Sequence, residues 1–93
     1  MNITGQWKKI TDDDCSKKYP ETIKYDTNGI YRADASSTSR VHPLWDVGTY
    51  EIKGDTINMS TSNDAIIRYP IVFKDGILTF RDPDGCVIKY QQL

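Results

Sequence analysis

The segment AIIRYPIVFKDGILTFRDPDGCVIKYQ, residues 65–91, decides the fold of this chain. Three runs of alternating apolar and polar residues follow one another here, separated by the turns Lys74-Asp75-Gly76 and Asp82-Pro83-Asp84-Gly85. An Asp-Gly pair places glycine where the backbone needs a positive φ, so it closes a tight hairpin at little steric cost. The segment therefore predicts three consecutive antiparallel strands over 65–73, 77–81 and 86–91.

The same pattern runs through the rest of the chain. Asn28-Gly29 and Lys53-Gly54-Asp55 give two further hairpin turns between runs rich in β-branched residues. Five more strands are predicted, over residues 3–11, 21–25, 30–34, 45–52 and 56–61. Between them lie a polar loop over 12–18, with room for one helical turn capped by an aspartate, and the longest loop, 35–44. Eight short sequential strands predict an all-β fold, a small antiparallel up-and-down barrel in which strand eight closes against strand one.

Composition agrees with this fold class. The chain has 93 residues, enough for one domain over 1–93, and contains eleven Ile, four Val, nine Thr and six Tyr against three Ala and three Leu. A net charge of −1 gives no overall field that would draw in nucleic acid or an anionic membrane. Because the N-terminus lacks a basic-then-apolar signal pattern, we expect a cytoplasmic location, with a trimmed secreted form as the alternative.

Strand alternation predicts which side chains enter the barrel. Many of these are large and aromatic, so we expect a mostly filled interior rather than a roomy lipid cavity. The predicted inward residues are Gly5, Trp7, Ile23, Tyr25, Tyr31, Ala33, Gly48, Tyr50, Ile52, Ile57, Met59, Ile67, Tyr69, Ile71, Phe73, Leu78, Phe80, Cys86, Ile88 and Tyr90. The predicted outward residues are Lys8, Lys24, Arg32, Glu51, Asn58, Arg68, Arg81 and Lys89.

Gly5-Gln6-Trp7, on the first predicted strand, is similar to the G-x-W motif that opens lipocalins and other calycins. With the loop and the seven meandering strands that follow, nearly the whole chain resembles a small lipocalin-like domain. The resemblance implies that Trp7 plugs one end of the barrel. It also implies a binding function, either for a ligand at the barrel or, as in small calycin-like protease inhibitors, for a protein through a loop or terminus.

Cys15 and Cys86 are the two cysteines of the chain. If strand eight closes against strand one, Cys86 and the loop that holds Cys15 come near each other, and a disulfide between them is one possibility. Two unpaired buried thiols are the other, which a reducing compartment favours.

No sequence motif points to catalysis. His42 is the one histidine, and no nucleophile motif such as G-x-S-x-G accompanies it. Two Cys and one His without ligand spacing do not predict a metal site. We therefore expect no catalytic, cofactor-binding or metal-binding residues.

The long Ser/Thr-rich loop is the expected recognition surface, because binding residues are often carried on loops that a rigid scaffold presents. It carries Arg40 and His42 and leads into Trp45, and Arg and Trp are favoured at interface hot spots. The Tyr-rich interior adds Tyr50 and Tyr69 as candidate ligand contacts.

These observations predict a non-enzymatic lipocalin-like binding domain. Its partner is a small apolar or aromatic ligand or a protein, with neither nucleic acid nor membrane involved, and the chain is a monomer or weak dimer. The alternative is a loop-presenting inhibitor or immunity-type protein acting through residues 35–45. An internal cavity of roughly several hundred Å³ would favour a small ligand, whereas a filled core would favour a surface role.

Overall fold

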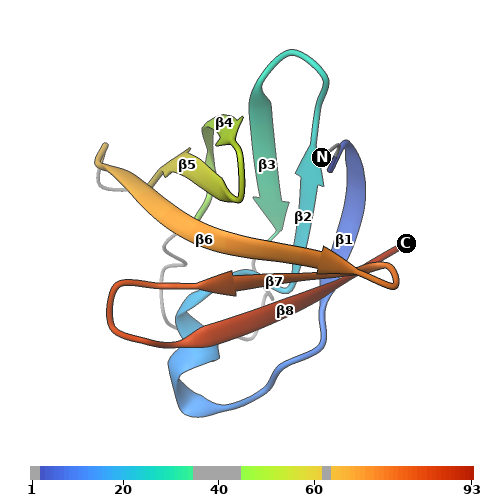
Figure 1. Cartoon of the computed structure of the whole chain (residues 1–93), viewed down its shortest axis with the longest axis vertical. Helices are drawn as coiled ribbons and strands as arrows, with labels where there is room; N and C mark the ends of the chain where they lie inside the picture. The colour runs from blue at the N-terminus through green and yellow to red at the C-terminus, as the bar shows by residue number, and fades with distance from the viewer. Residues whose placement is uncertain (1–2, 35–44, 62–63) are drawn as a thin grey trace.

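A computed structural model of the chain, which describes residues 3–34, 45–61 and 64–93, shows a closed barrel of eight antiparallel strands (Figure 1). Each strand pairs with its neighbours in sequence, and the all-β architecture predicted above is confirmed. The strands are β1 (Gly5–Lys9), β2 (Thr22–Tyr25), β3 (Ile30–Asp34), β4 (Val47–Lys53), β5 (Thr56–Ser60), β6 (Ile66–Lys74), β7 (Ile77–Arg81) and β8 (Val87–Gln92). A short 3-10 helix, η1 (Asp14–Lys18), lies between β1 and β2.

The barrel closes through the first and last strands. Trp7 of β1 lies opposite Gln92 of β8, and Lys9 lies opposite Tyr90. This pairing joins the two ends of the sequence and leaves no free sheet edge among the described strands. The predicted closure of strand eight against strand one is confirmed.

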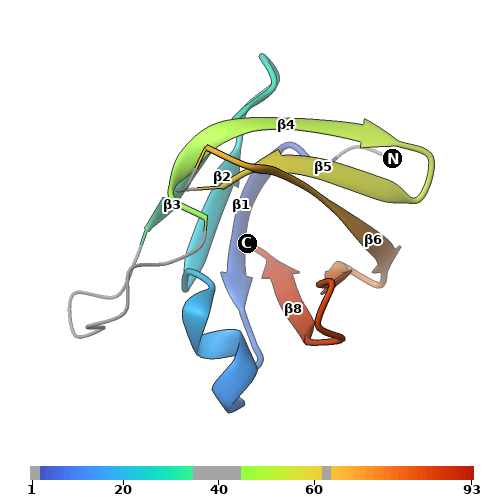
Figure 2. The ribbon, with the colours of Figure 1, turned by 90° about the vertical axis from the view of Figure 1, so that its left-hand side faces the viewer.

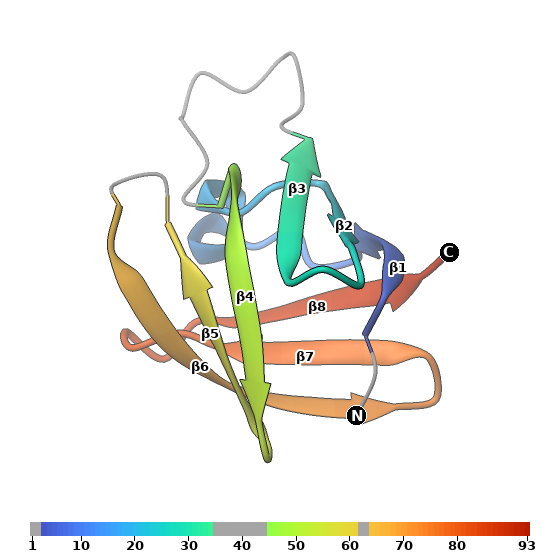
Figure 3. The same ribbon diagram turned by 90° about the horizontal axis from the view of Figure 1, so that it is seen from above.

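Two strands, β4 and β6, pair with one neighbour over their first part and with the other neighbour over their second part. The first half of β6, Ile66–Pro70, pairs with β5, and the second half, Ile71–Lys74, pairs with β7. Pro70, which has no N–H to donate, stands where β6 changes partner, a position that a strand proline tolerates. In Figure 3, β7 and β8 run across the view while β3 and β4 cross them steeply. This arrangement is typical of sheets that pack orthogonally around a shared core.

The connections divide between the two ends of the barrel. One end, called here the hairpin end, carries the tight turns after β2, β4 and β6. The other, called the η1 end, carries η1 itself and the turn between β7 and β8, and the described part of β3 and β5 ends there. Figure 2 shows η1 on the side of the molecule away from β4 and β5.

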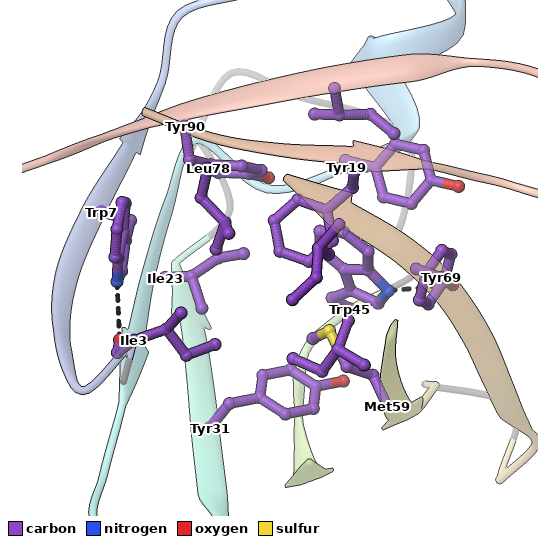
Figure 4. Close-up of a cluster of buried hydrophobic side chains, with 14 of the residues drawn as sticks. Ile3, Trp7, Tyr19, Ile23, Tyr31, Trp45, Met59, Tyr69, Leu78 and Tyr90 are labelled. Atoms are coloured by element: carbon purple, nitrogen blue, oxygen red, sulfur yellow. Dashed lines mark hydrogen bonds between the residues drawn. The ribbon is translucent and has the colours of Figure 1, made fainter. Parts of the chain in front are cut away.

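Every residue of the predicted inward set except Phe73 is buried or half-buried, and the core also contains Ile3, Tyr19 and Trp45, which the prediction did not include. The fully buried side chains are dominated by Trp, Tyr and Phe, and Figure 4 shows several of them filling the barrel. Trp7 is fully buried and donates its indole N–H to the Ile3 carbonyl oxygen at 2.8 Å. Phe73 is the exception: it lies next to the β6–β7 turn, is 39 % exposed, and packs edge-on against the Trp7 ring at 5.7 Å.

Two further details differ from the sequence prediction. The first strand begins at Gly5 rather than Ile3, and Ile3 is buried in the core although it lies outside the strand. The helical turn forms within 12–18 as predicted, but its N-cap residue, Asp13, makes no side-chain capping bond.

Gly48 marks a tight approach between β4 and its neighbours. A Cβ built there would lie 2.0 Å from the Ser60 hydroxyl oxygen and 3.3 Å from the Tyr31 ring. The Ser60 hydroxyl cannot retreat freely, because it accepts the Thr49 backbone N–H at 2.9 Å.

We predict that Gly48→Ala lowers the free energy of unfolding by about 1–3 kcal/mol, the usual cost of overpacking. Urea unfolding would measure this. In a Ser60→Ala background the same substitution should cost less, because the nearest atom is gone. An equal cost in both backgrounds would contradict the steric explanation.

Candidate functional site

The structure separates the residues that the sequence nominated for binding. Arg40 and His42 lie outside the described residues. Trp45 and Tyr69 are fully buried and lie together in the interior. Tyr50 is half-buried on β4, where its ring packs edge-on against Tyr25 at 4.9 Å.

Trp45 occupies the centre of the η1 end. Its ring centroid lies 4.6–6.2 Å from the rings of the four aromatic residues around it, and its indole N–H donates to the Tyr69 hydroxyl at 3.0 Å (Figure 4). Those four neighbours are Tyr19, Tyr69, Phe80 and Tyr90. The predicted strand over 45–52 begins at Val47 instead, so Trp45 precedes the strand and turns inward. A side chain in this position is part of the core and is not accessible to a partner.

All six tyrosine hydroxyls have hydrogen-bond partners inside the fold. The partners are Asp82 for Tyr19, the Met59 sulfur for Tyr25, the Ser60 carbonyl for Tyr31, the Asp26 carbonyl for Tyr50, the Trp45 indole for Tyr69 and the Pro20 carbonyl for Tyr90. Burial raises the pKa of Tyr31 to about 12, and it also raises the pKa of Tyr19, Tyr25, Tyr69 and Tyr90. These five phenols are therefore neutral near pH 7.

A buried lysine ties η1 to the barrel. The Lys9 ammonium donates to the carbonyl oxygens of Ser16 and Tyr19, both at 2.9 Å, and lies 3.3 Å from the Glu21 carboxylate. Its side chain is almost fully buried, which is tolerable because hydrogen bonds and an opposite charge satisfy the ammonium. The Ser16 carbonyl, which also accepts the Tyr19 backbone N–H at 3.0 Å, and the Tyr19 carbonyl just after η1 are thus held by the same ammonium.

Asp82 forms the second polar link at this end. One carboxylate oxygen accepts the Tyr19 hydroxyl at 2.7 Å, and the other accepts the backbone N–H groups of Asp84 and Cys86, which shapes the β7–β8 turn. Burial alone would raise the pKa of Asp82. The Tyr19 and backbone hydrogen bonds, with the Lys18 ammonium at 3.5 Å, outweigh burial and hold the pKa below its usual range.

A disulfide forms the third link. Cys15 of η1 and Cys86, which directly precedes β8, are joined, with their Cα atoms 6.0 Å apart and a sequence separation of 71. Cys15 is exposed whereas Cys86 is buried, so the bridge fastens the surface of η1 to the interior.

The outer face of the barrel has an uneven distribution of charge. The described strands hold nine Lys and Arg residues, of which only Lys9 is buried, but two acidic residues, Asp34 and Glu51. Most carboxylates lie in the connections instead. The strand cations are Lys8, Lys9, Lys24, Arg32, Lys53, Arg68, Lys74, Arg81 and Lys89. The sides of the barrel are therefore basic and its ends acidic.

A surface groove of about 370 Å³ lies within this basic face, over β1, β2 and β3. Lys24 of β2 and Arg32 of β3 line it and stand directly opposite each other in the strand register. Lys24 is 3.9 Å from Asp26, and Arg32 makes no ion pair with any residue in the described ranges. The remaining lining residues are Gln6, Thr22, Ile23, Ala33 and Leu93.

A second groove of about 220 Å³ lies over β4, β5 and β6. It is lined by Thr49, Tyr50, Glu51, Asn58, Ser60 and Ile66. Ser60 already bonds to Thr49 and Tyr31 here, so much of the polar lining is committed to the fold.

Sequence reasoning placed Lys24 and Arg32 outward but did not combine them into a site. The signal was present, because both cations flank the same turn. Asp26 N–H bonds to the Ile30 carbonyl, so Lys24 and Arg32 face each other two positions further along the hairpin. Sequence reasoning did not assign the register of the β2–β3 hairpin, which is what places the two cations opposite each other.

Comparison with known proteins gives no family assignment. No family model, curated protein or solved structure matches this chain. Across residues 3–34, 45–61 and 64–93, no cluster of three or more His, Cys, Asp or Glu side chains could hold a metal ion. The same part of the chain contains no helix long and apolar enough to cross a membrane.

We predict that Cys15→Ser/Cys86→Ser loses about 4 kcal/mol of unfolding free energy, because the bridge closes a long loop in the unfolded chain. Urea unfolding with and without reductant would measure this. Reductant should weaken the native chain by a similar amount and leave the double variant unchanged. Equal stability of the native chain and the variant would contradict the prediction.

We also predict that stability falls with acidification in a way that depends on Asp82. Since its pKa is lowered on folding, its contribution is complete above the unfolded pKa of about 4 and is lost as pH falls through the folded pKa. Asp82→Asn should be less stable than the native chain near pH 7 and should lose less stability between neutral and acidic pH. Thermal unfolding at a series of pH values measures both slopes, and equal slopes would contradict the prediction.

Proposed function

We propose that this domain is a non-enzymatic, lipocalin-like binding module that acts on a protein partner through its outer surface. The observation that carries this proposal is the aromatic cluster around Trp45, which fills the η1 end with side chains. Small-molecule sites in proteins are clefts or cavities of about 300–1,000 Å³. A barrel whose η1 end is filled by Trp45 and its four aromatic neighbours, and whose other end holds Trp7, has its binding capacity outside.

The lipocalin-like part of the proposal rests on the first strand. Gly5 begins β1 with a φ of +129°, and Trp7 follows it into the core beside Ile3 and Phe73. This position near the hairpin end agrees with a tryptophan that closes one end of a calycin barrel. Trp45 fills the other end.

The polar groups of the barrel interior support the proposal that the domain is not an enzyme. The buried tyrosines are neutral and already bonded, and Lys9 and Asp82 are fully engaged in holding η1 and the β7–β8 turn. A general acid or base needs a free site next to it for the reacting group. The described interior offers these polar groups only to one another.

The disulfide bears on the proposed location. Bridges of this kind form and persist in oxidising environments and are rare in the cytoplasm. Of the two locations considered above, the Cys15–Cys86 bridge supports the secreted alternative over the cytoplasm.

A small neutral probe tests the proposal. We expect that N-phenyl-1-naphthylamine, an uncharged apolar dye, shows no saturable fluorescence increase with the native chain, because core side chains occupy the barrel. Leu78→Ala provides the matched control with a smaller probe, since it removes a fully buried side chain and opens an apolar cavity that can take up benzene, and benzene binding to the native chain and to this variant would be compared by NMR. Circular dichroism would confirm that the variant is folded.

Saturable binding of the dye to the native chain, or an apolar molecule retained by the chain in native mass spectrometry, would support a carrier and overturn the surface proposal. Benzene binding to Leu78→Ala alone would agree with a filled native barrel.

The loop-presenting inhibitor remains a second candidate, and the position of Trp45 favours it. The segment acting in that hypothesis, residues 35–45, ends on a side chain held in the core, and β3 supports its other end. Arg40→Ala/His42→Ala should leave the melting temperature unchanged and reduce capture of the partner by about tenfold or more, about 1.4 kcal/mol. Unchanged capture would direct the search to the outer face of the strands.

A further inference from the structure

We propose that the groove over β1, β2 and β3 binds an acidic peptide segment of the partner, with a carboxylate held between Lys24 and Arg32. This inference rests on the proposed surface function and adds the place of the contact and the chemistry of the partner.

The two cations face each other at a cost to the free domain. Lys24 and Arg32 are direct cross-strand partners, and like charges in such positions are destabilising. Asp26 lies 3.9 Å from Lys24 and relieves it only weakly, and Arg32 makes no ion pair with the side chains that the structure describes. A carboxylate between the two side chains would remove this repulsion and supply the planar acceptor that a guanidinium matches best.

The other lining residues suit a peptide. Gln6 stands beside Lys24 in the register of β1 and β2, and its amide can donate to and accept from a peptide backbone. Val47, opposite Arg32 on β4, is 58 % exposed, and Leu93 on the far side of the groove is also exposed. The two cations of the groove therefore have exposed apolar side chains on either side. A peptide that carries both acidic and apolar residues would complement such a surface.

Closure of the barrel excludes another mode of peptide recognition. A peptide often joins a sheet by pairing with a free edge strand, but here each described strand has two partners. A peptide on this domain must therefore be held by outward side chains. The basic groove places several of them together.

The charges around the groove favour a short acidic segment over a nucleic acid. Asp26 lies at the hairpin end of β2, and Glu21 and the exposed Asp12–Asp14 run lie toward the η1 end. A long polyanion that passed through the groove would meet these carboxylates on both sides. A segment with one or two carboxylates fits between them.

The test is a selection of random ten-residue peptides displayed on phage, followed by fluorescence anisotropy with the best labelled peptides. With the native chain we expect enrichment of peptides rich in Asp and Glu next to apolar residues. Lys24→Glu/Arg32→Glu should weaken their binding by about tenfold or more, and raising salt from about 50 to about 500 mM should weaken binding to the native chain.

Arg81→Glu/Lys89→Glu is the matched control. It changes the net charge by the same amount on the outer face of β7 and β8, away from the groove, and should leave peptide binding within about twofold of the native value. Lys24→Gln adds an independent measurement, because loss of one like charge should weaken binding while the melting temperature stays equal or rises.

Several outcomes would overturn the inference. These are selected peptides without acidic residues, equal binding to Lys24→Glu/Arg32→Glu, or stronger competition by a single-stranded oligonucleotide than by the acidic peptide. Self-association of the native chain that Lys24→Glu/Arg32→Glu abolishes would identify a second copy as the occupant. None of these results requires dye binding inside the barrel, so they are distinguishable from failure of the surface proposal.

Discussion

The packing of Trp45 against four aromatic rings is the contact on which the rest of the structure depends. Eight short strands enclose a space that their own side chains must fill, because a void in a small core costs stability. At the η1 end a residue from outside the strands supplies the missing volume, and its indole N–H is satisfied by Tyr69. Tyr19, which leads out of η1, packs on the same ring at 4.6 Å. Filling the barrel therefore requires that η1 be held in place.

Three different interactions hold η1 against the barrel: the hydrogen bonds of Lys9, the hydrogen bond between Asp82 and Tyr19, and the disulfide. Lys9 bonds to carbonyl groups at the end of the short helix, Asp82 accepts the hydroxyl of the tyrosine that packs on Trp45, and the disulfide restricts the unfolded chain. A buried ammonium and a buried carboxylate are expensive alone, but both are bonded here. A domain of 93 residues has a small core, so this support at one end is a sizeable share of its stability.

The strand pattern and the closed barrel were predictable from the sequence because turn chemistry and alternation are local. Asp75-Gly76 and Asp84-Gly85 specify their hairpins within a few residues, and the alternating runs between them specify the inward face. Trp45 was expected on the recognition surface because it follows the long loop and begins the predicted strand 45–52, whereas the strand begins at Val47 and Trp45 turns inward from outside it. Lys9 follows the alternation inward, which its charge permits because η1 and Glu21 supply its partners.

The candidate site was less predictable because it depends on pairing between residues rather than on their types. Lys24 and Arg32 are ordinary outward cations in the sequence, and only the hairpin register sets them face to face. Their juxtaposition weakens the free domain slightly, whereas an aspartate or glutamate at either position would strengthen it. Under the proposed surface function, recognition falls to the outward side chains, since no described strand has a free edge. The pairing of Lys24 with Arg32 destabilises the free domain, and the proposed carboxylate between the two side chains would remove their repulsion.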